Sequence, residues 1–451
     1  MRNIHILFVL LFISSHCMAQ NSRILEQYID EGIRNNLNVK KNDLSVKVAT
    51  ETLRQAKGLF LPELSFNSSY SLAYGGRTLD IPTGDLLNPV YNTLNKLTGS
   101  DKFPNIGNTS EMFLPNNYQD NRLGFSMQLL NTDVYYAYKA NKEMVSIAQA
   151  KKGIYQNELA EAIKVAYFNY LSVLEIGRIL ELNRNTLVEL ERINIQFLNN
   201  GIKNKDAVYD AQFEISQLDS KTAENRKNIE LSKSYFNFLL NRDLNASIET
   251  DSLLGNIHPD YFYGKVSSNI GIENRQELKM LSKNISLKEN QLKMHTYNLW
   301  IPKIYLIDNI GFQGFKYKFD SRQFYNFAQI NLRWDLYSGG RRLSKKRSAK
   351  YQVESARHEF SEVKSKLELE KKKCVEEVIT ALQNYKTKSA ALESAKESFY
   401  ITDKKYKEGQ ILWLEVMEKQ NKYLSAQIQL SIQKYYILMK YAEFEKAIGN
   451  F

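Results

Sequence analysis

Histidine, the side chain that most often binds metals or moves protons near neutral pH, is scarce and scattered in this chain of 451 residues. Two of the five histidines lie in the first 20 residues, and the others stand far apart at His258, His295 and His358. Their spacing fits no metal site built from ligands close in sequence. The chain also has no nucleophile elbow and no dinucleotide-binding fingerprint. The sequence therefore predicts no enzyme, no cofactor and no bound metal.

The densest group of basic side chains begins directly after Gly339-Gly340 and comprises Arg341, Arg342, Lys345, Lys346 and Arg347. Two adjacent glycines resemble part of a phosphate-binding loop, but the rest of the spacing of that motif is absent. The glycines are better explained as a turn from a strand into a helix. Near a membrane the basic group could bind lipid head groups, whereas on an ordinary helix it would form a solvated face.

Residues 1–20 have the pattern of a secretory signal peptide. Arg2 precedes an apolar run from Ile6 to Ile13, and Cys17-Met18-Ala19 follows before a predicted cleavage near Ala19. The run is too short to span a bilayer as a helix. Acylation of Cys17, as in a lipoprotein, is less favoured because His16 lies where a small residue is usual.

Export limits the partners of the remaining chain. Cys374 would be its single cysteine, so it could form no internal disulfide. The formal net charge is +11, but Lys and Arg alternate with Glu along predicted helices, which is typical of solvated helical faces. We therefore expect no nucleic-acid partner. No mature segment has the roughly 18 uninterrupted apolar residues of a membrane helix, so any membrane contact must come from strands.

A duplicated unit organises the chain. Gly201, Val208 and Gln212 recur at one fixed offset as Gly409, Val416 and Gln420, and Leu59-Phe60-Leu61-Pro62 recurs as Leu299-Trp300-Ile301-Pro302. A repeat of this length indicates a duplicated structural unit, not a solenoid of short modules. Each unit is predicted to run helix, strand, loop, strand, very long helix, turn, helix. The predicted division is a signal peptide at 1–20, a first repeat at 21–241, a linker at 242–262 and a second repeat at 263–451.

The longest predicted helices exceed the size of a globular core. The segment from Arg341 to Glu408 contains no Gly or Pro, and a continuous helix over it would be roughly 100 Å long. The first copy, about 133–200, shows an apolar stripe with alternating steps of four and three. Each long helix ends at a glycine, Gly201 or Gly409, consistent with a left-handed cap. Shorter helices at about 206–241 and 412–448 return along them, and one at about 39–59 fills the remaining length.

Four segments between the helices alternate apolar and polar residues with period two. The predicted strands cover about 63–74, 122–130, 303–317 and 324–337. Segments of about ten residues with one apolar face are what a transmembrane β-barrel strand requires, although a soluble antiparallel sheet gives the same pattern. Asp308 interrupts the apolar set of the third strand. Residues 75–121, rich in Pro, Gly, Asn and Thr, are predicted to form a long solvent-exposed loop.

Four strands cannot close a barrel, and hydrocarbon does not tolerate an open sheet edge. Because the smallest barrels need about eight strands, the chain is predicted to contribute its sheet to an oligomer. Aromatic side chains gather where the strands meet the helices, at Phe60, Trp300, Trp334 and Tyr337. They are predicted to form an interfacial belt on the periplasmic side. The alternative is that they pack a helix–sheet corner.

Over essentially its whole mature length the chain resembles the TolC-like family of outer-membrane efflux proteins. The features that support this resemblance are the duplication, Leu61-Pro62 and Ile301-Pro302 before strands, the segment Trp334–Gly340, and Tyr406 with Gly409, Val416 and Gln420. The resemblance implies a mainly α fold with a membrane β-barrel portion. Three chains would each contribute four strands to one 12-strand barrel, and their helices would form a long periplasmic tunnel.

The resemblance also implies a function. Such a homotrimer is the exit duct of a tripartite efflux pump or a type I secretion system in the outer membrane, and an inner-membrane transporter energises it. Its partners are the lipid bilayer, a periplasmic adaptor (membrane fusion) protein and that transporter. The alternative is an exported helical scaffold of the cell envelope without transport activity. A passive porin is disfavoured because porins close a barrel from one chain.

The family narrows its tunnel with acidic residues just after the turn glycine. Matched from Gly409, these positions are Glu415 and Glu418, which are three residues apart, so both can face the lumen from one helix surface. Threefold symmetry would then assemble a ring of carboxylates that attracts cations and disfavours anions. The alternative is two ordinary solvated glutamates.

Other residues of the tip match the family only in part. The closing latch keeps Tyr406, but Ile411 occupies the place of its arginine and Ala207 that of its acidic partner. We therefore do not transfer the latch to this chain. Trp413, beside the turn, could contact an adaptor protein or pack the tip.

Overall fold

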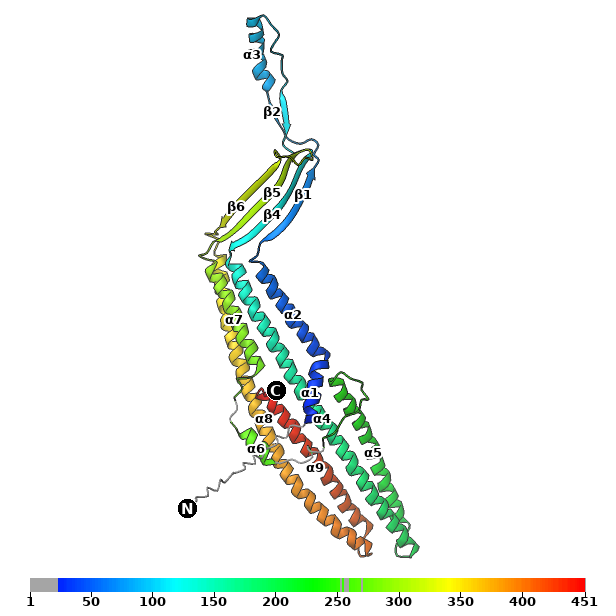
Figure 1. Ribbon diagram of the computed structural model, residues 1–451. Coiled ribbons are helices and arrows are strands. Elements are labelled where there is room, and N and C mark those ends of the chain that lie inside the picture. Colours follow the sequence, from blue (N-terminus) through cyan, green and yellow to red (C-terminus); the bar gives the residue numbers. More distant parts are fainter. Residues whose placement is uncertain (1–22, 252–253, 255–258, 269–270, 451) are drawn as a thin grey trace, which may run out of the picture. The chain divides into compact units, whose positions relative to one another are not determined.

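A computed structural model describes residues 23–251, 254, 259–268 and 271–450 of the chain (Figure 1). The predicted signal peptide at 1–20, with Cys17, lies outside the described residues. The elements are α1 (Arg23–Asn35), α2 (Leu37–Gly58), β1 (Glu63–Ser71), β2 (Thr78–Ile81), α3 (Thr83–Thr98), β3 (Thr109–Met112), β4 (Tyr118–Leu130), α4 (Thr132–Asn199), α5 (Asp206–Leu239), α6 (Pro259–Ser267), α7 (Gln276–Tyr297), β5 (Lys303–Phe315), β6 (Phe324–Arg333), α8 (Arg341–Lys407) and α9 (Trp413–Ala447).

The chain forms two compact units, which we call the helical unit and the strand unit. The described part of the helical unit covers 23–49, 143–285 and 354–450, and the strand unit covers 50–142 and 286–353. Helices α2, α4, α7 and α8 each contribute residues to both units. The prediction of a mainly helical chain with four long antiparallel strands is confirmed.

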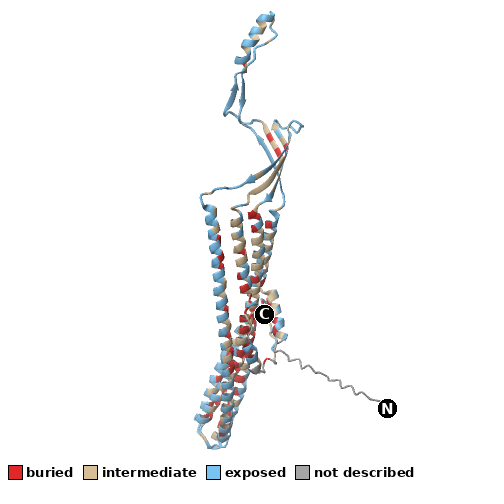
Figure 2. Ribbon diagram, turned by 90° about the vertical axis from the view of Figure 1, so that its left-hand side faces the viewer, coloured by how far each residue is buried: buried red, intermediate tan, exposed pale blue. Residues whose placement is uncertain are grey.

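Apolar stripes on the long helices build the core of the helical unit. Of the predicted stripe on α4, Leu159, Ile163, Ala166 and Tyr170 are buried. One cluster joins α1, α4, α5, α6, α8 and α9 around Tyr167, and a second gathers near the helical turns around Tyr406. Figure 2 shows buried residues spread along these packed helices. Burial of such stripes, more than helix propensity, stabilises helices of this length.

The strand unit contains one four-stranded antiparallel sheet in the order β1-β4-β5-β6. Residues directly opposite each other share a face, and the register pairs Phe66 with Leu123, Leu123 with Ile310, and Leu306 with Ile330. One apolar face therefore runs across all four strands, and its members Phe66 and Ile330 are about 70 % exposed. Asp308 lies on this face opposite Phe125. Among the described residues, β1 and β6 each pair on one side only.

Several strand ends differ from the predicted ones. Strand β6 ends at Arg333 instead of 337, because Arg333 pairs with Lys303 and the preceding Pro302 has no N–H to continue the ladder. Strand β4 begins at Tyr118, four residues earlier than predicted, because Tyr118 pairs with Ser71 of β1 and Phe315 of β5. Strands β1 and β5 end at Ser71 and Phe315, a few residues short of the predicted ends.

The prediction that residues 75–121 form only a loop was wrong. This segment contains helix α3 and the paired strands β2 and β3. Asparagine side chains hold it together: the Asn108 carboxamide accepts hydrogen bonds from the Gly84 and Asp85 N–H groups at the start of α3. Asn88 and Asn95 bond the backbone of Ile106 and Phe103. An Asn-rich composition suggested a loop, whereas long-range side-chain bonds make it ordered.

Two further observations concern boundaries and membrane spans. The predicted border between the linker and the second repeat, at 262 and 263, falls inside α6. Within the part of the chain that the structure describes, every helix is too short or too polar to cross a membrane.

Candidate functional site

Each helical hairpin of the helical unit turns at a glycine in the left-handed region. Gly201 has φ 70° and Gly409 has φ 73°, backbone angles that residues with a Cβ atom rarely adopt. The Ile202 N–H donates to the Phe197 carbonyl at 2.8 Å, and the Gln410 N–H donates to the Lys405 carbonyl at 3.0 Å. These six-to-one hydrogen bonds identify both turns as Schellman caps, so the predicted left-handed caps are confirmed.

Tyr406, in the last turn of α8, joins the two hairpins. Its ring is fully buried, and its hydroxyl donates to the Asn194 side-chain oxygen on α4. The Asn194 amide in turn donates to the Ala207 carbonyl of α5 at 2.7 Å. The Tyr406 ring packs against Phe197 and Trp413, with centroids 5.9 and 5.7 Å away. Burial raises the pKa of Tyr406 to about 12.

A lysine from the first turn completes this cluster. The Lys203 ammonium lies 3.7 Å from the centroid of the Tyr406 ring and 5.2 Å from that of Phe197, both within cation–π distance. It also donates to the Ile411 carbonyl at 3.4 Å, which links the two turns. Burial lowers the pKa of Lys203. A cation therefore contacts Tyr406 from the first repeat, whereas the resemblance would place the latch arginine in the second, at the position of Ile411.

A second polar contact lies in the buried interface behind the tip. The Gln420 amide donates to the Asn183 side-chain oxygen at 2.8 Å, and the Asn183 amide donates to the Gln427 side chain at 2.9 Å. Asn183 and Gln420 are both nearly inaccessible to solvent. Because an unpaired buried amide is costly, these bonds fix the register of α4 against α9.

The structure places Glu415 and Glu418 on the exposed surface of the first two turns of α9. The Glu415 carboxylate accepts the Leu412 N–H at 3.4 Å and so caps the helix start. Glu418 lies 2.5 Å from the Lys422 ammonium and 3.4 Å from that of Lys419. These hydrogen bonds, Lys422 first, lower the pKa of Glu418. Both carboxylates are thus accessible, and two lysines offset part of the charge of Glu418.

The predicted aromatic belt divides into two kinds of environment in the strand unit. Trp300 and Tyr337 are 73 % and 88 % exposed, and Trp334 is about half exposed. Phe60 instead packs edge-on against Tyr138, with centroids 6.0 Å apart. Phe60 therefore fits the helix–sheet corner that was the alternative, whereas the other three remain available to an interface.

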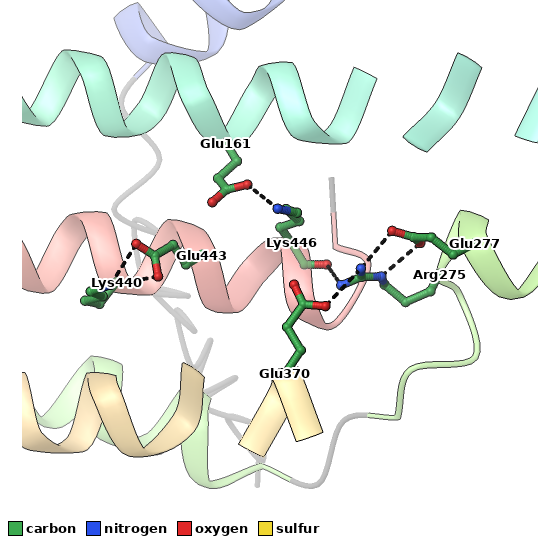
Figure 3. A network of polar contacts seen from close by, with 7 residues as sticks. All are labelled: Glu161, Arg275, Glu277, Glu370, Lys440, Glu443 and Lys446. Atoms are coloured by element: carbon green, nitrogen blue, oxygen red, sulfur yellow. Dashed lines mark hydrogen bonds and ion pairs between the residues drawn. The ribbon is translucent and has the colours of Figure 1, made fainter. Parts of the chain in front are cut away.

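Sequence reasoning missed a buried ion network in the helical unit (Figure 3). The Arg275 guanidinium is 3 % exposed and donates to both carboxylate oxygens of Glu277, to Glu370 at 3.3 Å and to the Lys446 carbonyl at 3.0 Å. The Lys446 ammonium lies 2.6 Å from Glu161 of α4. The network thus joins the start of α7 to α4, α8 and the end of α9. Glu277 is close to Arg275 in sequence, but nothing in the local sequence signals the distant partners Glu370 and Lys446.

Groups of three or more His, Cys, Asp or Glu side chains able to hold a metal are absent from the described ranges. The tip cluster joins the two hairpins through aromatic, hydrogen-bond and cation–π contacts, and its two glutamates are exposed.

Comparisons with known proteins agree with this architecture. The model of the outer membrane efflux protein family matches residues 273–450, most of the second repeat. A search of curated protein sequences finds no match.

Solved structures resemble the chain over nearly its full length. The outer membrane protein VceC of Vibrio cholerae has a TM-score of 0.73 at 16 % identity, covering 94 % of this chain and 96 % of its own. The CmeC outer membrane channel of Campylobacter jejuni has 0.75 at 15 %, covering 95 % and 86 %. The open-state MtrE outer membrane channel of Neisseria gonorrhoeae has 0.74 at 14 %, covering 94 % and 89 %. At such identities the likeness shows the fold.

Proposed function

We propose that this chain, which resembles outer-membrane efflux proteins in the sequence of residues 273–450 and in fold throughout, is one subunit of a trimeric outer-membrane exit duct. The duct is passive and serves a tripartite efflux pump or a type I secretion system. An inner-membrane transporter supplies the energy, and a periplasmic adaptor protein connects the two.

The open four-stranded sheet is the observation that supports this function most directly. Its outer strands β1 and β6 each pair on one side only among the described residues, and its apolar face is exposed from Phe66 to Leu332. In water both features favour aggregation. In a bilayer an apolar outer face is required, and the edges must pair with other strands. Joining β6 of one copy to β1 of the next satisfies both requirements.

The tip cluster supplies the features of a closable entrance. In the proposed trimer, α4, α5, α8 and α9 of each copy form the periplasmic tunnel, and the turns at Gly201 and Gly409 form its end. The contact of Tyr406 with Asn194 and Lys203 holds the two hairpins of one copy together. Glu415 and Glu418 of three copies then line the aperture. Opening requires the hairpins to separate, which exposes the buried Tyr406 ring.

The exposed Trp300, Trp334 and Tyr337 are proposed to lie at the periplasmic boundary of the bilayer, where aromatic side chains are favoured. The segment containing α3 joins β1 to β4 and would then lie outside the cell. A helical scaffold of the envelope would need neither an exposed apolar sheet face nor unpaired strand edges.

Native mass spectrometry of the protein extracted in mild detergent tests the proposal. We expect a trimer, recovered only from the outer-membrane fraction and resistant to washing with alkaline carbonate. Cys374 is buried, and burial raises the pKa of its thiol to about 11, so cysteines introduced into β1 and β6 can be cross-linked without interference. A folded monomer in the membrane, or release by the wash, would contradict the proposal and favour the scaffold.

A further inference from the structure

A polar cavity of about 210 Å³ lies in the strand unit, where β5 and β6 meet α7 and α8. We call it the basic junction pocket. Four cationic side chains line it: Lys303, Arg333, Arg342 and Lys345. Two carboxylates, Asp133 and Asp335, lie in the same lining, so cations exceed carboxylates by two.

The two carboxylates are already engaged. The Asp133 carboxylate accepts hydrogen bonds from the Lys303 ammonium and from the Asn298 amide. Asp335 lies 3.4 Å from Arg333. Arg342 donates to a backbone carbonyl, that of Asp335, and within the described ranges Lys345 forms no ion pair. Two cationic heads therefore face the pocket without a carboxylate of their own.

A histidine also lies in the lining of the pocket. His295 lines the same pocket, and its pKa is lowered first by burial and then by the charge of Lys345, while Asp133 acts in the opposite direction.

The strand register adds an independent observation. Lys303 and Arg333 lie directly opposite each other on β5 and β6. Like charges at opposite positions of an antiparallel pair repel each other. Asp133 compensates Lys303 and Asp335 compensates Arg333, so both carboxylates of the pocket are used by this opposed pair and neither is left for Arg342 or Lys345.

The corresponding junction of the first repeat shows that the architecture does not require these cations. Strand β1 begins with Glu63, where β5 begins with Lys303. The cavity near the start of α4 measures about 370 Å³ and is lined mainly by aromatic and aliphatic residues, among them Phe60 and Tyr136, with Tyr297 of α7 and three uncharged polar residues. Among the described residues, the lining of this cavity contains no Lys or Arg.

We infer that the basic junction pocket binds an oxyanion, a phosphate or carboxylate group of a small ligand. Guanidinium forks from Arg333 and Arg342 match the planar geometry of such groups, and Lys345 adds a point charge. Arg333 shares the polar face of the sheet with Asn331, so in the proposed duct this face lines the lumen; only this placement rests on the proposed function. The same lining includes Trp334, which the proposed duct places at the bilayer boundary, so the ligand is either an anionic cargo group in transit or the phosphate of a phospholipid.

Equilibrium dialysis of the purified full-length protein in detergent, with inorganic pyrophosphate as the probe, tests the pocket. The double variant Arg342→Gln with Lys345→Gln should bind pyrophosphate about tenfold more weakly, because two charged contacts of modest strength are lost. Arg347→Gln removes one positive charge from the same helix outside the pocket lining and should leave binding unchanged. Lys345→Gln alone should give an intermediate loss. Equal binding by all four proteins would overturn the inference.

Further measurements distinguish a lipid phosphate from a cargo anion, and they test the pocket independently of the proposed duct. Phospholipid that co-purifies with the wild type, is displaced by pyrophosphate and is lost in the double variant identifies a lipid phosphate as the natural ligand. Pyrophosphate block of channel current in planar bilayers, weaker in the double variant, identifies a cargo anion. Dialysis requires no channel activity, so binding without conductance would contradict the duct and leave the pocket standing. Channel conductance together with equal pyrophosphate binding by all variants would support the duct and contradict the pocket.

Discussion

In both repeats, the residue just before a helix is bonded to the end of the hairpin's returning helix, but the two repeats use different side chains for this bond. In the first repeat the Asn36 amide, just before α2, donates to the Leu239 carbonyl at the end of α5 at 3.1 Å. In the second, the Arg275 guanidinium, just before α7, donates to the Lys446 carbonyl at the end of α9. The backbones are alike here, since Asn241 and Gly449 both have positive φ.

The difference lies in the number of bonds at each joint. The Asn36 side-chain oxygen also accepts the Asn38 N–H at 2.9 Å and so caps α2, which makes the first joint the work of one neutral amide. Arg275 adds Glu277 and Glu370, so the second joint is a buried charge network. Duplication therefore preserved the backbone and let the side chains diverge, and the specialised chemistry of the chain lies where the repeats differ.

The largest expected effect separates the two joints. Arg275→Met should destabilise the protein by about 3–5 kcal/mol, because two carboxylates lose their buried partner. Asn36→Ala should cost about 1 kcal/mol, the value of one cap. Denaturant unfolding of the two variants, followed by helical circular dichroism, measures both. Equal losses would mean that the charge network adds nothing to the shared backbone joint.

In the sheet, unlike the joints, we expect equivalent substitutions in the two repeats to cause equal losses of stability. Phe66→Arg in β1 and Leu332→Arg in β6 both place a charge on the apolar face. Each should cost about 2–4 kcal/mol if it lies near the middle of the bilayer. Their neighbours on the polar face, Asn67→Arg and Asn331→Arg, should be tolerated. Folding titrations into lipid vesicles measure the four variants, and a loss at either asparagine would show that the assigned faces are reversed.

The tip should show a difference of intermediate size, because the second repeat has Tyr406 where the first has Leu198. Tyr406→Phe removes one hydrogen bond to Asn194 and should cost about 1 kcal/mol. The pKa of Tyr406 is raised to about 12, above that of an unfolded tyrosine, so its stabilisation is present below about pH 10 and declines as pH rises through about 12. Between these values the wild type should lose more stability than Tyr406→Phe. Parallel curves in pH-dependent unfolding would exclude this role.

The smallest effect on stability, and the one closest to function, concerns the glutamates of the second tip. Glu415→Gln with Glu418→Gln should preserve the helix cap, since Gln also caps, but should reduce cation selectivity in planar bilayers. Conversely, Lys422→Gln should increase that selectivity, because it removes the main partner of Glu418.

The first repeat provides the control for this prediction. At the same distances after Gly201 it has the buried Ala207 and the exposed Asp210. Asp210→Asn should leave selectivity unchanged if the aperture belongs to the second repeat. Unchanged selectivity in the double glutamate variant would leave the duct intact and remove the aperture assignment.

Local patterns in the sequence predicted a large part of this fold. The predicted apolar stripe from Leu159 to Val173 marks the buried face of α4, with Val173 partly buried, and alternation marks the apolar face of β6. Both periods follow from backbone geometry. The glycine turns also follow from local chemistry, since a left-handed cap strongly favours Gly. These patterns depend only on residues close together in the sequence, so they can be recognised without the structure.

Contacts between residues far apart in the chain could not be predicted from the sequence and are seen only in the folded structure. Tyr406 meets Asn194 across 212 positions, and Arg275 meets Lys446 across 171. The order within segment 75–121 likewise depends on Asn108 reaching back to the start of α3. No local periodicity records which polar side chain will meet which backbone carbonyl, because the partner is fixed only when the helices pack. Local sequence patterns therefore specify the repeated framework, whereas packing between distant segments creates the joints, the tip cluster and the basic junction pocket.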